Sequence, residues 1–162
     1  MPDGGLPPLA DQLAESWATS ARIDLYLLAA IDEDALDLQA PSKGRTVREA
    51  FLHLHNVRLM WIEVAGRDLM AGLAKLDREA RPAKAALTGA LAASAKAMED
   101  LIRRAAAAGG RVKNFKPHVG AFVGYLVAHE AHHRGQIALI LKLAKRPMDR
   151  KIGYGMWEWG SR

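Results

Sequence analysis

Three histidines fall within five positions of the segment 129–137, which reads HEAHHRGQI. The outer two, His129 and His133, are four residues apart, so a helix would place them on one face with neighbouring Cβ atoms. Neutral imidazoles at this spacing are a recognised pair of ligands for a divalent metal ion. His132 lies about 100° from His133 around such a helix and is not expected to join the pair. The spacing therefore indicates a metal site.

Two alternatives must be considered for the same segment: a zinc protease motif, and a pair of core histidines that bind no metal. The first five letters match H-E-x-x-H, in which Glu130 would be the general base of a zinc protease. That motif needs a further ligand downstream, but no histidine follows His133, and Gln136 occupies the place of a required glycine. The other alternative is a pair of core histidines bonded to backbone or water. An unpaired buried polar group costs roughly 2–7 kcal/mol, and one ion would satisfy both imidazoles.

A third ligand would have to come from another part of the chain. His53 and His55 both lie in the segment HLHNVRLMW, and each shares a helical face with apolar residues. Periodicity alone therefore does not choose between them. His118 stands just before the last long helical segment, where a surface position is expected.

Four long segments with helical periodicity must position these histidines. The first follows LPP, the second opens with the capping-box pattern Thr46–Glu49 and runs to Gly66, the third follows Pro82 and stops at a glycine pair, and the fourth spans about 117–145. No strand pattern of useful length occurs. We therefore predict one all-α domain over residues 1–162, a four-helix bundle.

The tail after the fourth helix, RPMDRKIGYGMWEWGSR, is too apolar for a loose end. We expect Trp157 and Trp159 to pack back on the bundle, and Trp61 to lie in the core. No apolar run is long enough to span a bilayer, and the N-terminus does not resemble a secretory signal. These features predict a soluble cytoplasmic protein without a membrane partner.

The composition and charge limit the classes of function. The chain has no cysteine, which excludes disulfides, thiolate ligands and a cysteine nucleophile. Residues 1–80 hold 8 Lys and Arg against 13 Asp and Glu, whereas residues 81–162 hold 15 against 5. A basic half can attract an anionic small molecule or nucleic acid, but only Phe115 accompanies the basic residues for base stacking. Nucleic-acid binding is the weaker alternative, and a solvated surface with two charged faces is the simplest explanation.

The segments HLHNVRLMW and HEAHHRGQI together resemble the DinB/YfiT-like family of metal-binding four-helix bundles. The resemblance extends over most of the chain, including GMWEWG in the tail. It implies a divalent ion, zinc or nickel in the first place, held by one histidine of the second helix and two of the fourth. His53 stands eight residues before Trp61, the spacing that the family's ligand shows, so the resemblance implies the set His53, His129 and His133. It also implies a homodimer.

The resemblance further implies a metal-dependent thiol S-transferase, or a related hydrolase or isomerase. Because the chain lacks cysteine, the thiolate would come from a low-molecular-weight cosubstrate. Arg134 is then a candidate contact for an acidic substrate, or else a member of an ion pair. Gln136 is a candidate to orient a ligand, or else a polar contact between helices. No catalytic residue is assigned, and the alternative is a non-enzymatic metal-binding protein of the stress response.

Overall fold

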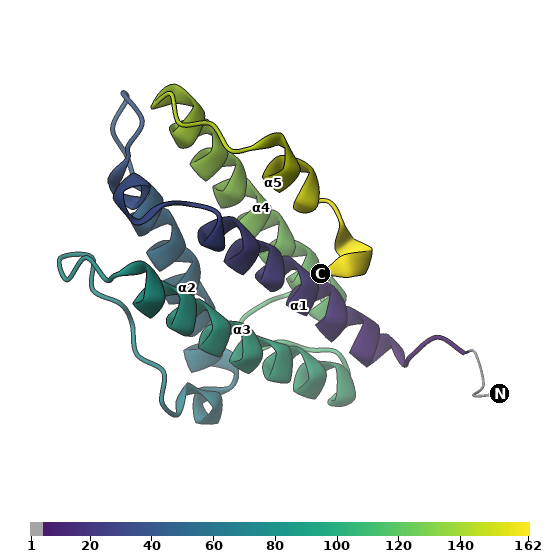
Figure 1. Ribbon diagram of the computed structural model, residues 1–162. Helices are drawn as coiled ribbons and strands as arrows, with labels where there is room; N and C mark the ends of the chain where they lie inside the picture. The colour runs from purple at the N-terminus through teal and green to yellow at the C-terminus, as the bar shows by residue number, and fades with distance from the viewer. Residues whose placement is uncertain (1–4) are drawn as a thin grey trace.

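The computed structural model describes residues 5–162, which form four long α-helices and four short helical segments (Figure 1). The long helices are α1 (Leu9–Ala29), α2 (Val47–Ala65), α3 (Lys84–Ala107) and α4 (Val119–Leu143). The short segments are η1 (Glu33–Asp37), η2 (Arg67–Met70), α5 (Arg150–Gly155) and η3 (Trp159–Ser161). Each of α1 and α2 packs against both α3 and α4, which gives a four-helix bundle. The predicted all-α fold is confirmed.

Local sequence signals account for several helix ends. The Thr46 hydroxyl accepts a hydrogen bond from the backbone N–H of Glu49 at 3.2 Å, and the Glu49 carboxylate accepts one from the N–H of Thr46 at 3.0 Å. The predicted capping box is therefore present at the start of α2. Gly109 and Gly110 follow α3 with φ of 90° and 76°, the left-handed conformation that ends a helix. His118 is exposed, and its Nδ1 accepts from the N–H of Ala121 as the N-cap of α4.

The bundle core consists of two apolar clusters with a polar layer between them. One cluster gathers around Trp17 and Phe122, and the other around Leu27 and Leu54. Between them lie buried polar or charged residues contributed by all four long helices, among them Asp24, Arg58, Ser94, Glu130, His133 and Arg134. The histidines of α4 thus lie at the level of this layer.

Ion pairs neutralise most of the charge in the layer. Arg58 donates to Asp24 Oδ2 and to Glu130 Oε1, each at 2.7 Å, and Arg134 donates to Asp24 Oδ1 at 2.6 Å. Arg58 also donates to the carbonyl of Leu91 at 2.9 Å. Burial raises the pKa of Glu130 well above its usual value, against the opposing effect of Arg58. Such a layer costs desolvation energy and makes each member dependent on its partners.

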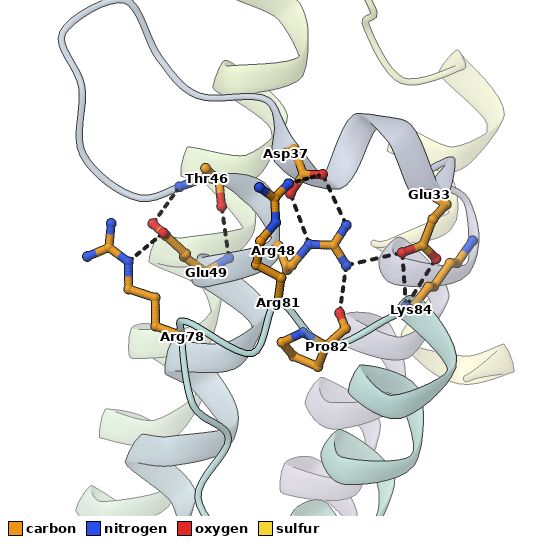
Figure 2. Close-up of polar contacts among 9 residues, drawn as sticks. All are labelled: Glu33, Asp37, Thr46, Arg48, Glu49, Arg78, Arg81, Pro82 and Lys84. Atoms are coloured by element: carbon orange, nitrogen blue, oxygen red, sulfur yellow. Dashed lines mark hydrogen bonds and ion pairs between the residues drawn. The ribbon is translucent and has the colours of Figure 1, made fainter.

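A second polar cluster at the surface ties the start of α2 to η1 and to the start of α3 (Figure 2). Arg48 donates to Asp37 at 3.0 Å, to Glu33 at 3.1 Å and to the carbonyl of Pro82 at 2.6 Å. Arg78, on the connection between η2 and α3, pairs with Glu49 at 2.6 Å. The connection 71–83 is thereby held against α2 although it contains no long helix.

The C-terminal tail returns along α4 and α1 (Figure 1), and it packs there mainly through residues other than Trp157. The guanidinium of Arg162 lies over the ring of Tyr26 at 3.8 Å, and Gly155 is buried. A Cβ at Gly155 would lie 2.3 Å from the Tyr26 hydroxyl, so glycine permits this close approach. Trp157 is 81% exposed, so the expectation that its side chain packs on the bundle is wrong. Trp159 is 40% exposed and lines hollows together with residues of α1 and α4.

Within residues 5–162, no helix combines the length and the apolar character needed to cross a membrane.

Candidate metal centre

His53 from α2 and His129 and His133 from α4 come together on one side of the bundle. Each offers one ring nitrogen, and the three nitrogens lie within 4.8 Å of one another. The ring centroids are 5.3 Å apart for His53 and His129, and 4.7 Å apart for each pair that includes His133. The i, i+4 spacing of α4 supplies two nitrogens, and the packing of α2 on α4 supplies the third.

Burial and a nearby cation keep these imidazoles neutral at pH 7. Burial is the main cause that lowers the pKa of all three, and for His53 it acts with the charge of Arg45 to bring the pKa to about 4. His133 is buried, whereas His53 and His129 are half-buried. A neutral imidazole has a free lone pair, which is the form that binds a metal ion.

Gln136 sets the hydrogen position on one of the rings. Its amide oxygen lies 2.8 Å from His133 Nδ1. Because that oxygen only accepts, Nδ1 carries the hydrogen and Nε2 keeps the lone pair. This contact is of the kind that orients a metal ligand in known sites.

The other histidines lie outside the group. His55 is buried on another face of α2, with Nδ1 3.0 Å from the carbonyl of Ala90 and Nε2 3.0 Å from that of Ala74. Both of its ring nitrogens lie against backbone carbonyls, so His53, and not His55, is the histidine of α2 that lies beside His129 and His133. His132 is exposed and does not join the three.

Arg134 and Glu130 point into the bundle. The Arg134 guanidinium contacts Ser20 and Asp24 of α1 and is nearly buried. Glu130 is buried beside Arg58, and its Oε2 has no hydrogen-bond partner among the residues that the structure describes. A general base must reach a substrate, so this placement of Glu130 counts against the protease alternative.

Two residues beside the histidines were not singled out by sequence reasoning. Arg45 is exposed, and its Nη2 lies 3.4 Å from His53 Nδ1. Tyr125, 37% exposed, stacks beside His129 with ring centroids 6.2 Å apart and planes at 25°. Tyr125 precedes His129 by four residues, so the helical spacing that identified the histidine pair could also have identified Tyr125. No comparable signal existed for Arg45.

An aromatic cluster continues from Tyr125 away from the histidines. Trp61 packs edge-on against Phe115, Phe122 and Tyr125 at centroid distances of 5.9, 5.3 and 5.8 Å. Trp61 is half-buried at the edge of the apolar cluster around Trp17 and Phe122. The histidine site is therefore bordered by a cation on one side and by aromatic rings on another.

Comparison with known families agrees with this arrangement. The model of the DinB family matches residues 1–147, which include all four long helices and the three clustered histidines. The chain belongs to the DinB family. Among curated proteins, and likewise among solved structures, none matches the chain significantly. Membership in the DinB family accounts for the helical fold, and the chemistry has to be argued from the site itself.

The donor set fits a divalent metal ion. Three neutral imidazoles from two helices are within reach of one ion, and imidazole is a preferred ligand of zinc, nickel, copper and iron. A tetrahedral ion with three protein ligands keeps a fourth position for water or substrate, as catalytic zinc sites do. The site is thus compatible with a catalytic ion.

Proposed function

We propose that this DinB-family protein is an enzyme that uses a divalent ion, zinc or nickel, to transfer a thiol to an electrophilic substrate. His53, His129 and His133 would hold the ion. The observation that carries the proposal is the convergence of three neutral imidazole nitrogens within 4.8 Å, two of them on half-buried side chains that solvent reaches. A purely structural zinc site is usually closed by four protein ligands.

A divalent ion bound here would lower the pKa of a thiol or water molecule at its open coordination position. The chain has no cysteine, so the sulfur must come from a small cosubstrate. Transfer forms a bond from that sulfur to an electrophilic carbon, and the leaving group departs with the bonding electrons while the thiol proton passes to solvent. A related hydrolase or isomerase would use water or a reversible addition at the same place.

The chain's own residues would position the reactants. Gln136 holds the tautomer of His133 in which Nε2 has a free lone pair. Tyr125 offers an exposed aromatic face next to His129, against which an apolar part of a substrate could lie. Arg134 contacts the buried layer, so we do not assign it to substrate.

Metal analysis of tag-free protein tests the proposal. We expect about one divalent ion per chain, as one group of three histidines implies, and its loss in His133→Ala. His132→Ala is the matched control, because His132 is an exposed neighbour on the same helix, and this variant should keep its ion. Metal-free protein that takes up neither zinc nor nickel would contradict the proposal.

We also propose that the protein forms a homodimer through the outer face of α4. This face exposes Leu139 by 55% and Leu143 by 50%. Small exposed residues on the same helix, Gly124, Ala128, Ala131 and Gly135, would allow a second helix to approach closely.

A further inference from the structure

Arg45 is a cation at the edge of the histidine site, and no acidic side chain of residues 5–162 pairs with it. Its only side-chain hydrogen bond among residues 5–162 is the 3.4 Å contact of Nη2 with His53 Nδ1, and no carboxylate lies within 4.0 Å of it there. By contrast, Arg48 on the next turn is occupied by Asp37 and Glu33 (Figure 2).

The backbone around Arg45 is held in place. Residues 39 and 46 form an antiparallel bridge, and the N–H of Val47 donates to the carbonyl of Leu38 at 3.0 Å. Gly44 has φ of 107°, a conformation open to glycine, and its carbonyl accepts from the Gln39 side chain. Arg45 is followed at once by Thr46, the N-cap residue of α2. The guanidinium is therefore presented from a defined turn.

A metal ion bound by His53 would remove the acceptor that Arg45 has within residues 5–162. An ion on Nε2 of His53 requires the neutral ring to carry its hydrogen on Nδ1, which then no longer accepts. An ion on Nδ1 takes the lone pair itself. In both cases the Arg45 guanidinium would lose its contact with His53 and lie beside a divalent cation. Its N–H groups would then be free to donate to an anion.

We propose that Arg45 forms an anion subsite beside the metal centre and selects a thiol cosubstrate that carries a carboxylate. The carboxylate accepts from the guanidinium in the planar two-bond arrangement that arginine favours, while the sulfur of the same molecule occupies the open position on the ion. The inference rests on the proposed function and adds to it the class of thiol. Arg45 would select the thiol by binding its carboxylate, because the reacting sulfur is bound at the ion and not at Arg45.

Thiol binding to Co²⁺-loaded, tag-free, full-length protein tests this assignment. The probes are 3-mercaptopropionate and its neutral counterpart 3-mercaptopropionamide, titrated while the cobalt–thiolate absorption band is recorded. The variants are Arg45→Gln, which removes the charge, and Arg45→Lys, which keeps the charge without the fork. Lys43→Gln is the matched control, because it removes a positive charge from the same turn.

Arg45→Gln should weaken binding of the carboxylate thiol by about tenfold or more, the usual range for a hydrogen bond to a charged group, and leave the amide thiol unchanged. Arg45→Lys should fall between, and Lys43→Gln should match the unmodified protein. Equal effects of Arg45→Gln on the two thiols, or none on either, would overturn the anion subsite while leaving the proposed function standing. Absence of a cobalt–thiolate band with both thiols in the unmodified protein would overturn both.

Discussion

At the scale of single residues, the clustered histidines gain their metal-binding form from being partly removed from water. A charged imidazolium is disfavoured by burial and by the neighbouring cation Arg45, so each ring holds its proton less well than in the unfolded chain. The same effect that frees the lone pairs makes the metal-free protein sensitive to acid.

His53 gives that sensitivity a direction. Its pKa falls from 6.5 in the unfolded chain to about 4 in the folded protein, so between these values the unfolded chain binds more protons. The free energy of unfolding should therefore decrease as the pH falls from 6.5 toward 4, and the contribution is complete above 6.5. Metal-free protein should lose more stability between pH 7 and pH 5 than the His53→Gln variant does, as measured by urea unfolding.

The comparison with His53→Gln is needed because Glu130 acts in the opposite sense. Its pKa is raised in the folded protein, so it adds stability as the pH falls. Both proteins contain Glu130, and its effect cancels in the difference. Equal loss of stability in the two proteins would show that His53 is not held neutral by the fold.

The buried ion pairs predict two very different carboxylate variants. Asp24→Ala leaves the guanidinium groups of Arg58 and Arg134 without their shared acceptor and should cost about 3–5 kcal/mol of unfolding free energy. Glu130→Gln keeps an oxygen that accepts from Arg58 and should cost no more than about 1.5 kcal/mol. Urea unfolding at pH 7 measures both, and similar costs would show that Asp24 is not the central member of the layer.

Residue chemistry was only partly readable from the sequence. The four-residue step from His129 to His133 was enough to bring them onto one face, because that geometry is local to a helix. The choice between His53 and His55 depended on the connection 71–83, whose carbonyl at Ala74 occupies one nitrogen of His55. Arg134 was expected near an acidic substrate or in an ion pair, and its partner Asp24 lies 110 residues earlier, beyond any local pattern.

At the scale of elements, neighbouring residues of one short motif in α2 have two different roles. In HLHN, His53 faces α4, while His55 and Asn56 hold the connection 71–83. The Asn56 amide donates to the carbonyl of Leu76 and its oxygen accepts from the N–H of Leu76, both at 3.0 Å. The Asn56 side chain thus satisfies both backbone hydrogen-bonding groups of Leu76, as a neighbouring backbone segment would do.

Asn56→Ala should release this connection while leaving the long helices intact. Loss of the two hydrogen bonds should cost about 1–3 kcal/mol, and most of the effect should be local. Hydrogen exchange measured by mass spectrometry should accelerate in peptides covering 71–83, with little change in α1 or α4. Uniform acceleration over all four long helices would mean that the connection does not open independently of the bundle.

Helix ends could be predicted where they depend only on residues close in sequence. The capping box at Thr46 and the glycine pair after α3 were predicted, since they depend on neighbouring residues alone. The tail was harder, because Gly155 and Arg162 pack on Tyr26 through a backbone approach that apolar content does not reveal. The apolar character of Trp157 suggested burial, and its side chain instead projects outward.

At the scale of the whole molecule, the two apolar clusters should keep the bundle folded without an ion. They lie on either side of the polar layer, and neither needs the histidines for its packing. Chelation of the ion, or His133→Ala, should therefore leave the far-ultraviolet circular dichroism of the helices in place at 25 °C. Loss of the helical signal on chelation would identify the ion as structural and remove the basis for the proposed catalysis.

The proposed homodimer is the second prediction at this scale. Light scattering at micromolar concentration and moderate salt should give twice the chain mass of 17.7 kDa. Leu139→Lys places a charge at an exposed apolar position of α4 and should shift the population toward the monomer mass, with Lys142→Gln as the control on the same helix. A monomer mass for the unmodified protein would count against pairing through α4.

The charged layer across the core also bears on how fast the chain folds. Arg58, Asp24 and Arg134 come from α2, α1 and α4, so their water must be removed as three helices dock, before every ion pair has reached its final geometry. Removing this water raises the free energy of the transition state and so slows folding. Apolar side chains, by contrast, begin to stabilise contacts as soon as the helices meet. The bundle should consequently fold more slowly than its many local contacts alone would allow, with the middle of the core closing last.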